Sequence, residues 1–325
     1  MNHRAPLYPL KFHPIPKQKV WGGSKLHSLF NRPNIENIGE SWEISGIEES
    51  ISLVSNGPLA GKSLQWLLDT YEAQLVGQEV FNNFGTKFPL LFKFIDARED
   101  LSVQVHPDDV LAKERHDSFG KTEMWYILDA EKTARLILGF RENINKEIYN
   151  EALQKNAITD ILNSVAVKKG DAFILTPGTV HAIGAGIMLA EIQQTSDITY
   201  RIYDWDRPDT DGKLRQLHTE LAMEAIDFSP TKGKIGYRDQ INLPVQVGAT
   251  AYFGVNKLTL SKDFSRDLSK IHSFVVYMCL EGNATLLVNG YRETMVGGET
   301  ILIPAHSSEV SFQTKSASFL EVYIP

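Results

Sequence analysis

The sequence predicts a mainly β protein whose first part carries helical elaborations and whose last part is β structure alone. Three observations predict this fold. Most of the chain reads as short strands separated by turns, three stretches interrupt this pattern with helical periodicity, and one late segment repeats an earlier one. We therefore expect two β domains, with the helices in residues 1–230 and none in residues 231–325.

Seven segments of the first part have the apolar character of strands and are bounded by turn residues. In chain order they are ISLVSNGPLAG, FPLLFKFIDA, LSVQVHP, TEMWYILDA, TARLILGF, DAFILTP and IMLAEIQQ. The three helical stretches cover about residues 63–84, 107–116 and 145–162. The first begins with a serine that can cap a helix, and the second has Pro107 in its first turn beside acidic residues.

The last part of the chain contains a partial copy of the first. GGETILIPAHSSEV resembles the earlier KGDAFILTPGTVHAI, since each has a Gly turn, an acidic residue, an apolar strand and a Pro before a loop. The dipeptide NG at residues 289–290 is a strong hairpin signal. In the aligned copies, Phe274 replaces Glu123 and Ser308 replaces His181. The second copy thus keeps the strands and lacks the charged groups.

Composition limits the classes of function. The 325 residues are 42% hydrophobic and 22% charged, which is ordinary for a globular protein with a sizeable core. A net charge of −7 without long runs of like charge argues against a nucleic-acid partner, whereas a small anionic substrate needs only a local basic cluster. Because Cys279 is the one cysteine, any metal must use His and oxygen ligands. Its apolar surroundings, FVVYMCL, indicate a buried hydrophobic position.

The sequence also bears on location. No apolar stretch reaches the roughly 18 residues that a membrane helix requires. The N-terminal segment is interrupted by prolines and has no apolar core of signal-peptide length. We therefore expect no membrane partner and cytoplasmic residence.

Four side chains of metal-ligand type lie on strands or at strand ends. In LSVQVHPDD, Gln104 and His106 are two residues apart and share one face of a strand. Glu123 opens the strand EMWYIL, and His181 follows the turn PGT. Each signal is weak alone, because a single His is more often structural. In a small barrel, however, alternate positions face the interior and the four can converge. Two imidazoles, a carboxylate and an amide oxygen suit zinc or another divalent first-row metal with an open position.

Four longer segments resemble the signature regions of type I phosphomannose isomerases in their short bacterial form. They are LSVQVHPDD, GKTEMWYIL, GDAFILTPGTVHAIGAG and EIQQTSDITYRIYDWDR, and the resemblance extends to KVWGG and GESWEIS near the N-terminus. It implies two cupin (jelly-roll type) β-barrels with helical elaborations on the first. It also implies interconversion of mannose 6-phosphate and fructose 6-phosphate through an enediol. The implied cofactor is one zinc ion per chain, with the ligands Gln104, His106, Glu123 and His181.

The same resemblance implies roles for further residues. The family's active-site arginine corresponds to Arg201, its lysine before the ligand glutamate to Lys121, and its acidic residue before the arginine to Glu191. Arg201 suits a developing oxyanion or a phosphate. Glu191 is our first choice for the proton-transferring base, and Lys121 is its competitor. Ser102, Lys121 and Arg207 are the candidates for binding the substrate phosphate.

The chain departs from the longer members of that family at functional positions. It has Thr122 where they have Pro, and IYDWDR follows the arginine where they read AGLTPK, so that Arg207 replaces their lysine. Their large helical insertion is shortened, since about 58 residues separate Glu123 from His181. These departures leave the identity of the sugar phosphate less determined than the family.

Three alternative functions stay open. The first is a related cupin isomerase for glucose 6-phosphate or an unphosphorylated sugar, and the second is a metal-containing sugar-binding or regulatory cupin without catalysis. An iron-dependent dioxygenase is the third, and it fits Gln104 as a ligand poorly. Individual residues also have structural alternatives, because Glu191 can orient a ligand His and Arg201 can pair with Asp204 or Asp206. The sequence does not predict the oligomeric state.

Overall fold

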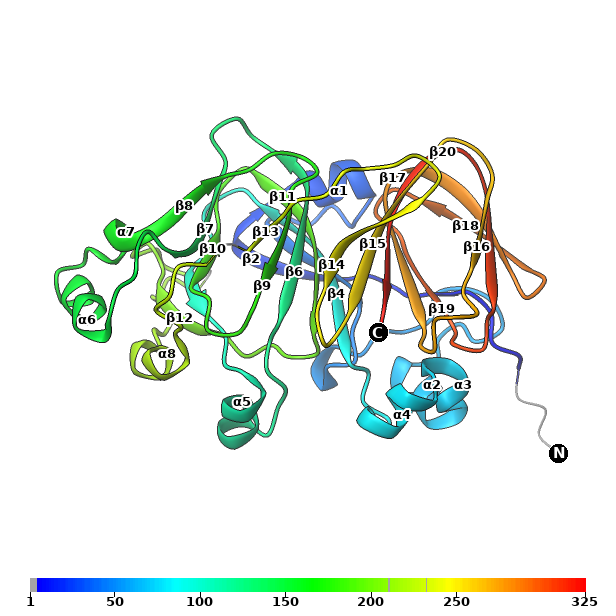
Figure 1. Cartoon of the computed structure of the whole chain (residues 1–325), viewed down its shortest axis with the longest axis horizontal. Coiled ribbons are helices and arrows are strands. Elements are labelled where there is room, and N and C mark those ends of the chain that lie inside the picture. The colour runs from blue at the N-terminus through cyan, green and yellow to red at the C-terminus, as the bar shows by residue number, and fades with distance from the viewer. Residues whose placement is uncertain (1–4, 210, 232) are drawn as a thin grey trace.

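In the computed structural model, which describes residues 5–209, 211–231 and 233–325, the chain forms three sheets of antiparallel strands with short helices around them (Figure 1). The seven-stranded sheet lies in the middle and has the order β13-β9-β6-β11-β4-β2-β3. In that order its strands span Lys234–Ile235, Ala172–Leu175, Glu123–Ala130, Ile187–Gln194, Leu90–Ala97, Ile15–Gly23 and Ile38–Ile44.

A five-stranded sheet covers one face of the seven-stranded sheet. Its order is β12-β5-β10-β7-β8. In that order its strands span Tyr200–Tyr203, Val103–Val105, His181–Ile183, Arg135–Phe140 and Leu162–Ala166. Buried side chains from β4, β6, β9 and β11 meet those from β7 and β10 in one apolar cluster between the two sheets. The inner faces of both sheets are therefore fixed by hydrophobic packing.

The third sheet has eight strands and is built mainly from the C-terminal part of the chain. Its main order is β1-β19-β17-β20-β15-β14, while β16 pairs with β20 and β18 with β17. Numbered from β14 to β20, its strands span Pro244–Ala249, Gly254–Leu260, Phe264–Asp267, Val275–Val288, Tyr291–Val296, Thr300–Ile303 and Glu309–Tyr323. The N-terminal strand β1, Leu10–Lys11, adds to its edge. The hairpin at residues 289–290 has φ values of 51° and 83°, as a two-residue turn requires.

Helices occupy the sheet edges and the connections. They span Lys25–Phe30 (α1), Leu64–Tyr71 (α2), Ala73–Val76 (α3), Gln78–Phe84 (α4), Asp109–His116 (α5), Lys146–Gln154 (α6), Ile158–Ile161 (α7) and Thr219–Ala225 (α8), with a 3-10 turn at Glu48–Ser50. Six of them, α2 to α7, lie in the three stretches with helical periodicity. The Ser63 hydroxyl caps α2 by accepting from the Trp66 amide at 3.1 Å. Pro107 precedes the Asp108 cap of α5 and so lies outside its first turn.

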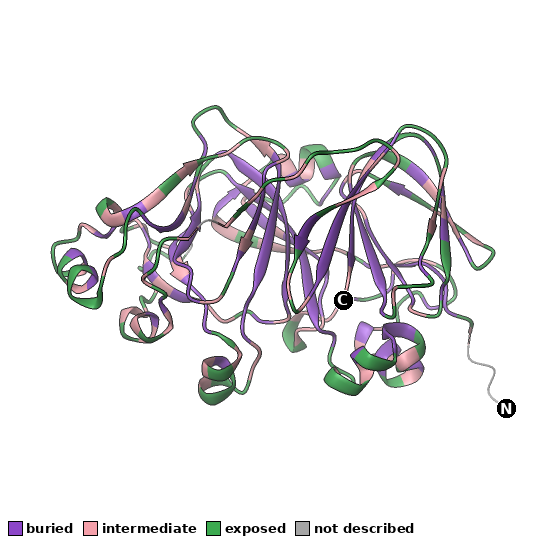
Figure 2. Ribbon diagram, in the orientation of Figure 1, coloured by how far each residue is buried: buried purple, intermediate pink, exposed green. Residues whose placement is uncertain are grey.

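The seven-stranded sheet is buried on both faces, which explains its nearly continuous apolar strands. In β4, Phe92 and Phe94 enter the large cluster shared with the C-terminal sheet and α2 to α4. The alternate residues Lys93 and Ile95 face the five-stranded sheet. Figure 2 shows these central strands as buried, with exposed residues concentrated in loops and outer helices. This alternation places every second residue of β4, β6 and β11 on the inner face.

The closed barrels implied by the resemblance are not formed. In the described part of the chain, each sheet ends in unpaired edge strands. The five- and seven-stranded sheets pack as a sandwich whose edge strands β12 and β3 stay apart. Residues of both strands line the cleft described below, among them Arg201 of β12 and Glu40 of β3. The division at residue 230 stays a prediction.

Two further sequence predictions, one strand and the absence of a membrane helix, can be compared with the structure. The segment ISLVSNGPLAG contributes only isolated bridges at Leu53 and Val54, because turns at Gly57 and Gly61, both with positive φ, interrupt it. Within the described residues, no helix combines the length and apolarity needed to cross a membrane.

Candidate metal centre and active-site cleft

Three side chains of metal-ligand type converge between the two sheets. The ligand atoms of His106, Glu123 and His181 all lie within 4.8 Å of one another, and all three residues are buried. His106 Nε2 is 3.3 Å from one Glu123 carboxylate oxygen, and His181 Nε2 is 3.7 Å from the other. In the described part of the chain, this is the only such group of His, Cys, Asp and Glu side chains. These residues form a site that could hold a metal ion.

Hydrogen bonds on the far side of each imidazole fix its tautomer. His106 Nδ1 donates to the carbonyl oxygen of Ile198 at 2.8 Å, and His181 Nδ1 donates to that of Thr179 at 2.9 Å. A carbonyl can only accept, so the protons are on Nδ1 and each Nε2 carries a lone pair. Both lone pairs lie beside the carboxylate of Glu123. Backbone contacts of this kind orient metal-ligating histidines in proteins.

Polar atoms without partners support a metal at this point. His106 Nε2 and both oxygens of Glu123 are buried and form no hydrogen bond with the described residues. Burying polar atoms without hydrogen bonds is costly. Lys121 Nζ lies 3.2 Å from one Glu123 oxygen, and a metal cation would bind all three atoms. Burial and Lys121 lower the pKa of His106 to about 3, and burial lowers that of His181. Burial opposes ionisation of Glu123, but Lys121 and His106 outweigh it and hold its pKa well below the usual range. The protonation states are thus those of metal ligands.

Strand register brings two further predicted residues to this centre. On the five-stranded sheet, Gln104 lies opposite His181 on one side and opposite Arg201 on the other. The Gln104 amide nitrogen is 3.2 Å from His181 Nε2. The nitrogen and oxygen of this amide are distinguished by hydrogen bonding alone. A rotation of the amide by half a turn would put its oxygen in the place of its nitrogen. Ligation by Gln104 therefore stays a prediction with suitable geometry.

A second row of side chains crosses the inner face of the seven-stranded sheet. Glu191 of β11 lies opposite Trp125 of β6 and Lys93 of β4, and Lys93 lies opposite Trp42 of β3. Lys93 Nζ is 2.9 Å from Glu191 Oε1, and the Trp125 indole donates to Glu191 Oε2 at 2.8 Å. Burial raises the pKa of Glu191 even though Lys93 opposes this. Glu191 is therefore a buried carboxylate held at both oxygens.

Lys93 also interacts with a second carboxylate. Its Nζ is 3.9 Å from Glu40, whose other oxygen is 3.7 Å from Lys19. The Trp42 indole donates to Glu40 at 2.6 Å. Burial disfavours the ionised form of Glu40, but Lys93 and Lys19 outweigh it and set the pKa at about 2. Glu40 is thus always charged near neutral pH. The raised pKa of Glu191 lies closer to the pH at which a general base exchanges protons.

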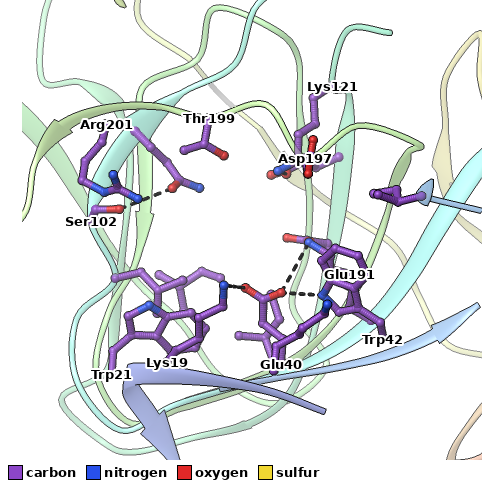
Figure 3. A pocket seen from close by; sticks show the side chains of 18 of the residues that line it. Lys19, Trp21, Glu40, Trp42, Ser102, Lys121, Glu191, Asp197, Thr199 and Arg201 are labelled. Atoms are coloured by element: carbon purple, nitrogen blue, oxygen red, sulfur yellow. Dashed lines mark hydrogen bonds and ion pairs between the residues drawn. The ribbon is translucent and has the colours of Figure 1, made fainter. Parts of the chain in front are cut away.

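Both rows border a cleft with a volume of about 410 Å³. Glu123 and Gln104 line it, so the candidate metal centre lies at its wall. Figure 3 shows Arg201, Thr199 and Ser102 on one side of the cavity and Glu191 and Trp42 across from them. The cleft therefore combines a candidate metal site with a buried carboxylate and a guanidinium on opposite sides.

Comparison with known proteins shows the family. Residues 10–170 match the family model described as phosphomannose isomerase type I, catalytic domain. Residues 246–323 match the model described as mannose-6-phosphate isomerase, cupin domain. Mannose-6-phosphate isomerase ManA of Bacillus subtilis is 36% identical over 91% of this chain and 93% of that protein. The chain belongs to the type I phosphomannose isomerase family.

Further relatives support the same family assignment. The mannose-6-phosphate isomerase of Streptococcus mutans is 33% identical and covers 90% of this chain and 96% of its own length. The crystal structure of the mannose 6-phosphate isomerase from Bacillus subtilis superposes with a TM-score of 0.89 at 30% identity, covering 98% of this chain and all of that one. A phosphomannose isomerase mutant from Salmonella typhimurium, at 18% identity and a TM-score of 0.78, supports the fold alone.

The cleft of this family member includes most of the residues that the sequence indicates. Ser102, Lys121, Glu191 and Arg201 all line it. Lys121 is buried, and its Nζ lies 3.2 Å from Glu123. Arg207 does not belong to the lining. Its guanidinium donates to Glu99 at 3.1 Å and to the backbone oxygen of residue 100 at 2.9 Å.

Sequence reasoning missed several polar residues of the cleft. Lys93 and Glu40 flank the candidate base, and Arg215 and His218 lie beside Arg201. The charge of Lys93 in the middle of the apolar run FPLLFKFI is a signal that could have indicated a functional position. No comparable local signal marks Arg215 or His218, which reach the cleft only because the chain folds back after β12.

The corresponding region of the second copy has a different environment. Phe274 is fully buried in the apolar cluster below the C-terminal sheet. Ser308 is exposed, and its carbonyl accepts from the Leu268 amide. His306 is exposed and lies 3.2 Å from the side-chain amide of Asn289. Apolar packing and loop contacts thus occupy the positions where the first copy has metal-type ligands.

Proposed function

We propose that this chain is a zinc-dependent aldose-ketose isomerase that interconverts mannose 6-phosphate and fructose 6-phosphate through an enediol. One observation carries the proposal: the buried and converging His106, Glu123 and His181 lie at a cleft that also contains a buried carboxylate, Glu191, and a guanidinium, Arg201. Relatives named for this activity share 33–36% of their residues over about nine-tenths of this chain.

Zinc is the metal we propose, with one ion per chain. Two neutral imidazoles and one carboxylate leave room for a fourth protein ligand, for which Gln104 is in position, and for substrate. When bound, zinc supplies Lewis-acid stabilisation of negative charge on the substrate oxygens. The surrounding buried side chains exclude water and keep His106, Glu123 and His181 in fixed orientations.

Glu191 is proposed to move the proton between the two carbons. An ionised carboxylate can take a proton from one carbon of the enediol unit and return it to the other. Lys93 and the Trp125 indole hold both of its oxygens, so its position is fixed before substrate binds. Lys121, beside Glu123, is proposed to donate to a substrate oxygen. Proton transfer by Lys121 is the alternative that the pH experiment below addresses.

Arg201 is proposed to stabilise the enediolate from the opposite side of the cleft. It lies across the strand pair from Gln104, next to the candidate metal centre. Its Nε is buried and forms no hydrogen bond with the described residues, so the guanidinium retains donor capacity. Charge that develops on a substrate oxygen is stabilised most by donors already in place. Ser102, which is buried in the same wall, can add a hydroxyl donor.

The test is a coupled assay on metal-quantified protein. Purified protein is stripped with a chelator, reconstituted with zinc, and supplied with mannose 6-phosphate while fructose 6-phosphate formation is followed. We expect activity only in the reconstituted sample, with about one zinc per chain. Parallel assays with glucose 6-phosphate and mannose separate the related isomerases. Binding of sugar phosphate without isomerisation, and without deuterium exchange from heavy water into the sugar, would refute catalysis and favour a sugar-binding cupin.

A further inference from the structure

The segment after β12 folds back on this strand and adds two side chains to the cleft. The Arg201 amide donates to His218 Nδ1 at 3.1 Å, and the His218 amide donates to the Arg201 carbonyl at 2.7 Å. The Arg201 guanidinium also donates to the carbonyl of Gln216 at 2.9 Å. These three bonds fix residues 215–218 against β12. Arg215 and His218 consequently line the cleft beside Arg201.

His218 presents a hydrogen-bond donor there. Since Nδ1 accepts the backbone proton of Arg201, the proton of a neutral imidazole must be on Nε2. Burial and the charge of Arg201 lower the pKa of His218, which favours this neutral form. The free edge of the ring is therefore an N–H donor suited to an anion.

Arg215 presents a guanidinium that is only partly satisfied. Its Nε and Nη2 donate to the two oxygens of Asp204 at 2.6 and 2.5 Å. This bidentate contact holds the side chain rigidly and leaves Nη1 as a donor. Arg201 and Arg215 both line the cleft, and burial together with the charge of Arg215 lowers the pKa of Arg201. A bound anion would compensate both charges.

A second guanidinium contacts the same aspartate without entering the cleft. Arg207 Nη2 is 3.4 Å from Asp204, and its remaining bonds go to Glu99 and a backbone carbonyl. Arg215 lines the cleft, whereas Arg207 does not. Of the two arginines on Asp204, only Arg215 is placed to contact a ligand in the cleft.

We propose that Arg215 and His218 form the phosphate-binding subsite of the cleft. This inference rests on the proposed function for the identity of the ligand, a sugar phosphate. In that arrangement the carbonyl end of the sugar lies at His106, Glu123 and His181, while its phosphate is bound beyond Arg201 by the segment 215–218. The phosphate is bound equally in substrate and transition state, so the subsite acts on KM more than on kcat.

The experiment measures binding of inorganic phosphate to zinc-loaded protein by calorimetry. Five variants are compared with the wild type. They are Arg215→Lys, which keeps a charge for Asp204 but lacks the fork, His218→Asn, His218→Gln, Arg207→Gln, and the control Arg135→Gln, whose side chain is exposed on β7. An Asn side chain can replace Nδ1 as the acceptor for the Arg201 amide but removes the Nε2 donor. Gln can replace that donor. Far-UV circular dichroism and zinc content establish that each variant is folded.

We expect Arg215→Lys and His218→Asn to weaken phosphate binding about tenfold or more, the loss typical of one hydrogen bond to a charged group. His218→Gln should stay closer to the wild type, and Arg135→Gln should equal it. The same two weakened variants should raise KM for mannose 6-phosphate by a similar factor. Unchanged phosphate binding in both would overturn the inference, as would loss of binding in Arg207→Gln alone. Because calorimetry needs no turnover, an inactive wild type that binds phosphate at Arg215 would refute the proposed function and leave this subsite intact.

Discussion

Replacing Lys93 by Met should move the acid limb of the pH-rate profile to higher pH. Lys93 is the cation closest to the proposed base, with its Nζ 2.9 Å from Glu191 Oε1 and both side chains buried. A methionine fills a similar volume but carries no charge. Burial of Glu191 would then act without the opposing ammonium, so its pKa would rise further.

The expected size follows from the geometry. At 2.9 Å and an effective dielectric constant of about 20, two unit charges attract by about 6 kcal/mol, an upper limit for the effect. Desolvation of the pair offsets part of this, and a cation within contact distance typically shifts a carboxyl pKa by about 1–3 units. We therefore expect a shift of about 1–3 pH units. A base works only when ionised, so activity is lost as pH falls through the raised pKa and returns above it.

The assay is kcat/KM for mannose 6-phosphate against pH, with zinc quantified at each end of the range. Lys93→Arg is the matched control, because it retains a cation between Glu191 and Glu40 and should keep the acid limb near that of the wild type. Breaking a buried ion pair costs about 3–5 kcal/mol, so thermal unfolding must show that Lys93→Met is folded. An unshifted acid limb in folded, zinc-loaded Lys93→Met protein would refute Glu191 as the titrating base and favour Lys121.

Four further substitutions test the remaining roles. His181→Ala and Glu123→Ala should each remove zinc and activity together, because each takes one of three converging ligands; two tightly held metals in the wild type would contradict a single site. His306→Ala should leave zinc content unchanged by elemental analysis, and a loss of metal would show that the second copy binds it. Arg201→Lys should retain zinc and lose about 10²-fold in kcat, as removal of one preorganised oxyanion donor does. Near-normal kcat with a raised KM would instead reassign that residue to phosphate binding.

Much of the fold could be predicted because its determinants are local. The apolar runs TEMWYILDA and IMLAEIQQ correspond to β6 and β11, and NG corresponds to the hairpin between β17 and β18. Side-chain caps at Ser63 and Asn145 begin helices where the periodicity starts. The short helices α1 and α8 went unpredicted. They have six and seven residues, and buried side chains such as Leu26 and Ala222 stabilise them through tertiary contacts.

The candidate site, too, could be predicted only where its determinants are local. The spacing of Gln104 and His106 gives them one face of β5, which local periodicity determines. The contacts of Lys93 with Glu191 and of Arg215 with Asp204 depend on strand register and on a chain reversal, neither of which local patterns specify. The resemblance pointed to Arg207 for the phosphate because it matched a position in sequence. In the folded chain it is Arg215, eight residues later, that lines the cleft.

Register explains how a mostly apolar sheet keeps Glu191 in place. On β11, Met188, Ala190 and Ile192 enter the apolar cluster beneath the C-terminal sheet, so Glu191 must face the opposite side. A slip of one residue would bury this carboxylate among apolar side chains and expose an alanine in the cleft, at the cost of burying an unpaired charge. The bulge between Met188 and Leu189 adjusts the pairing with β6 so that Trp125 lies opposite Glu191. The hydrophobic pattern that stabilises the fold therefore also orients the proposed base toward Lys93 and the candidate metal ligands.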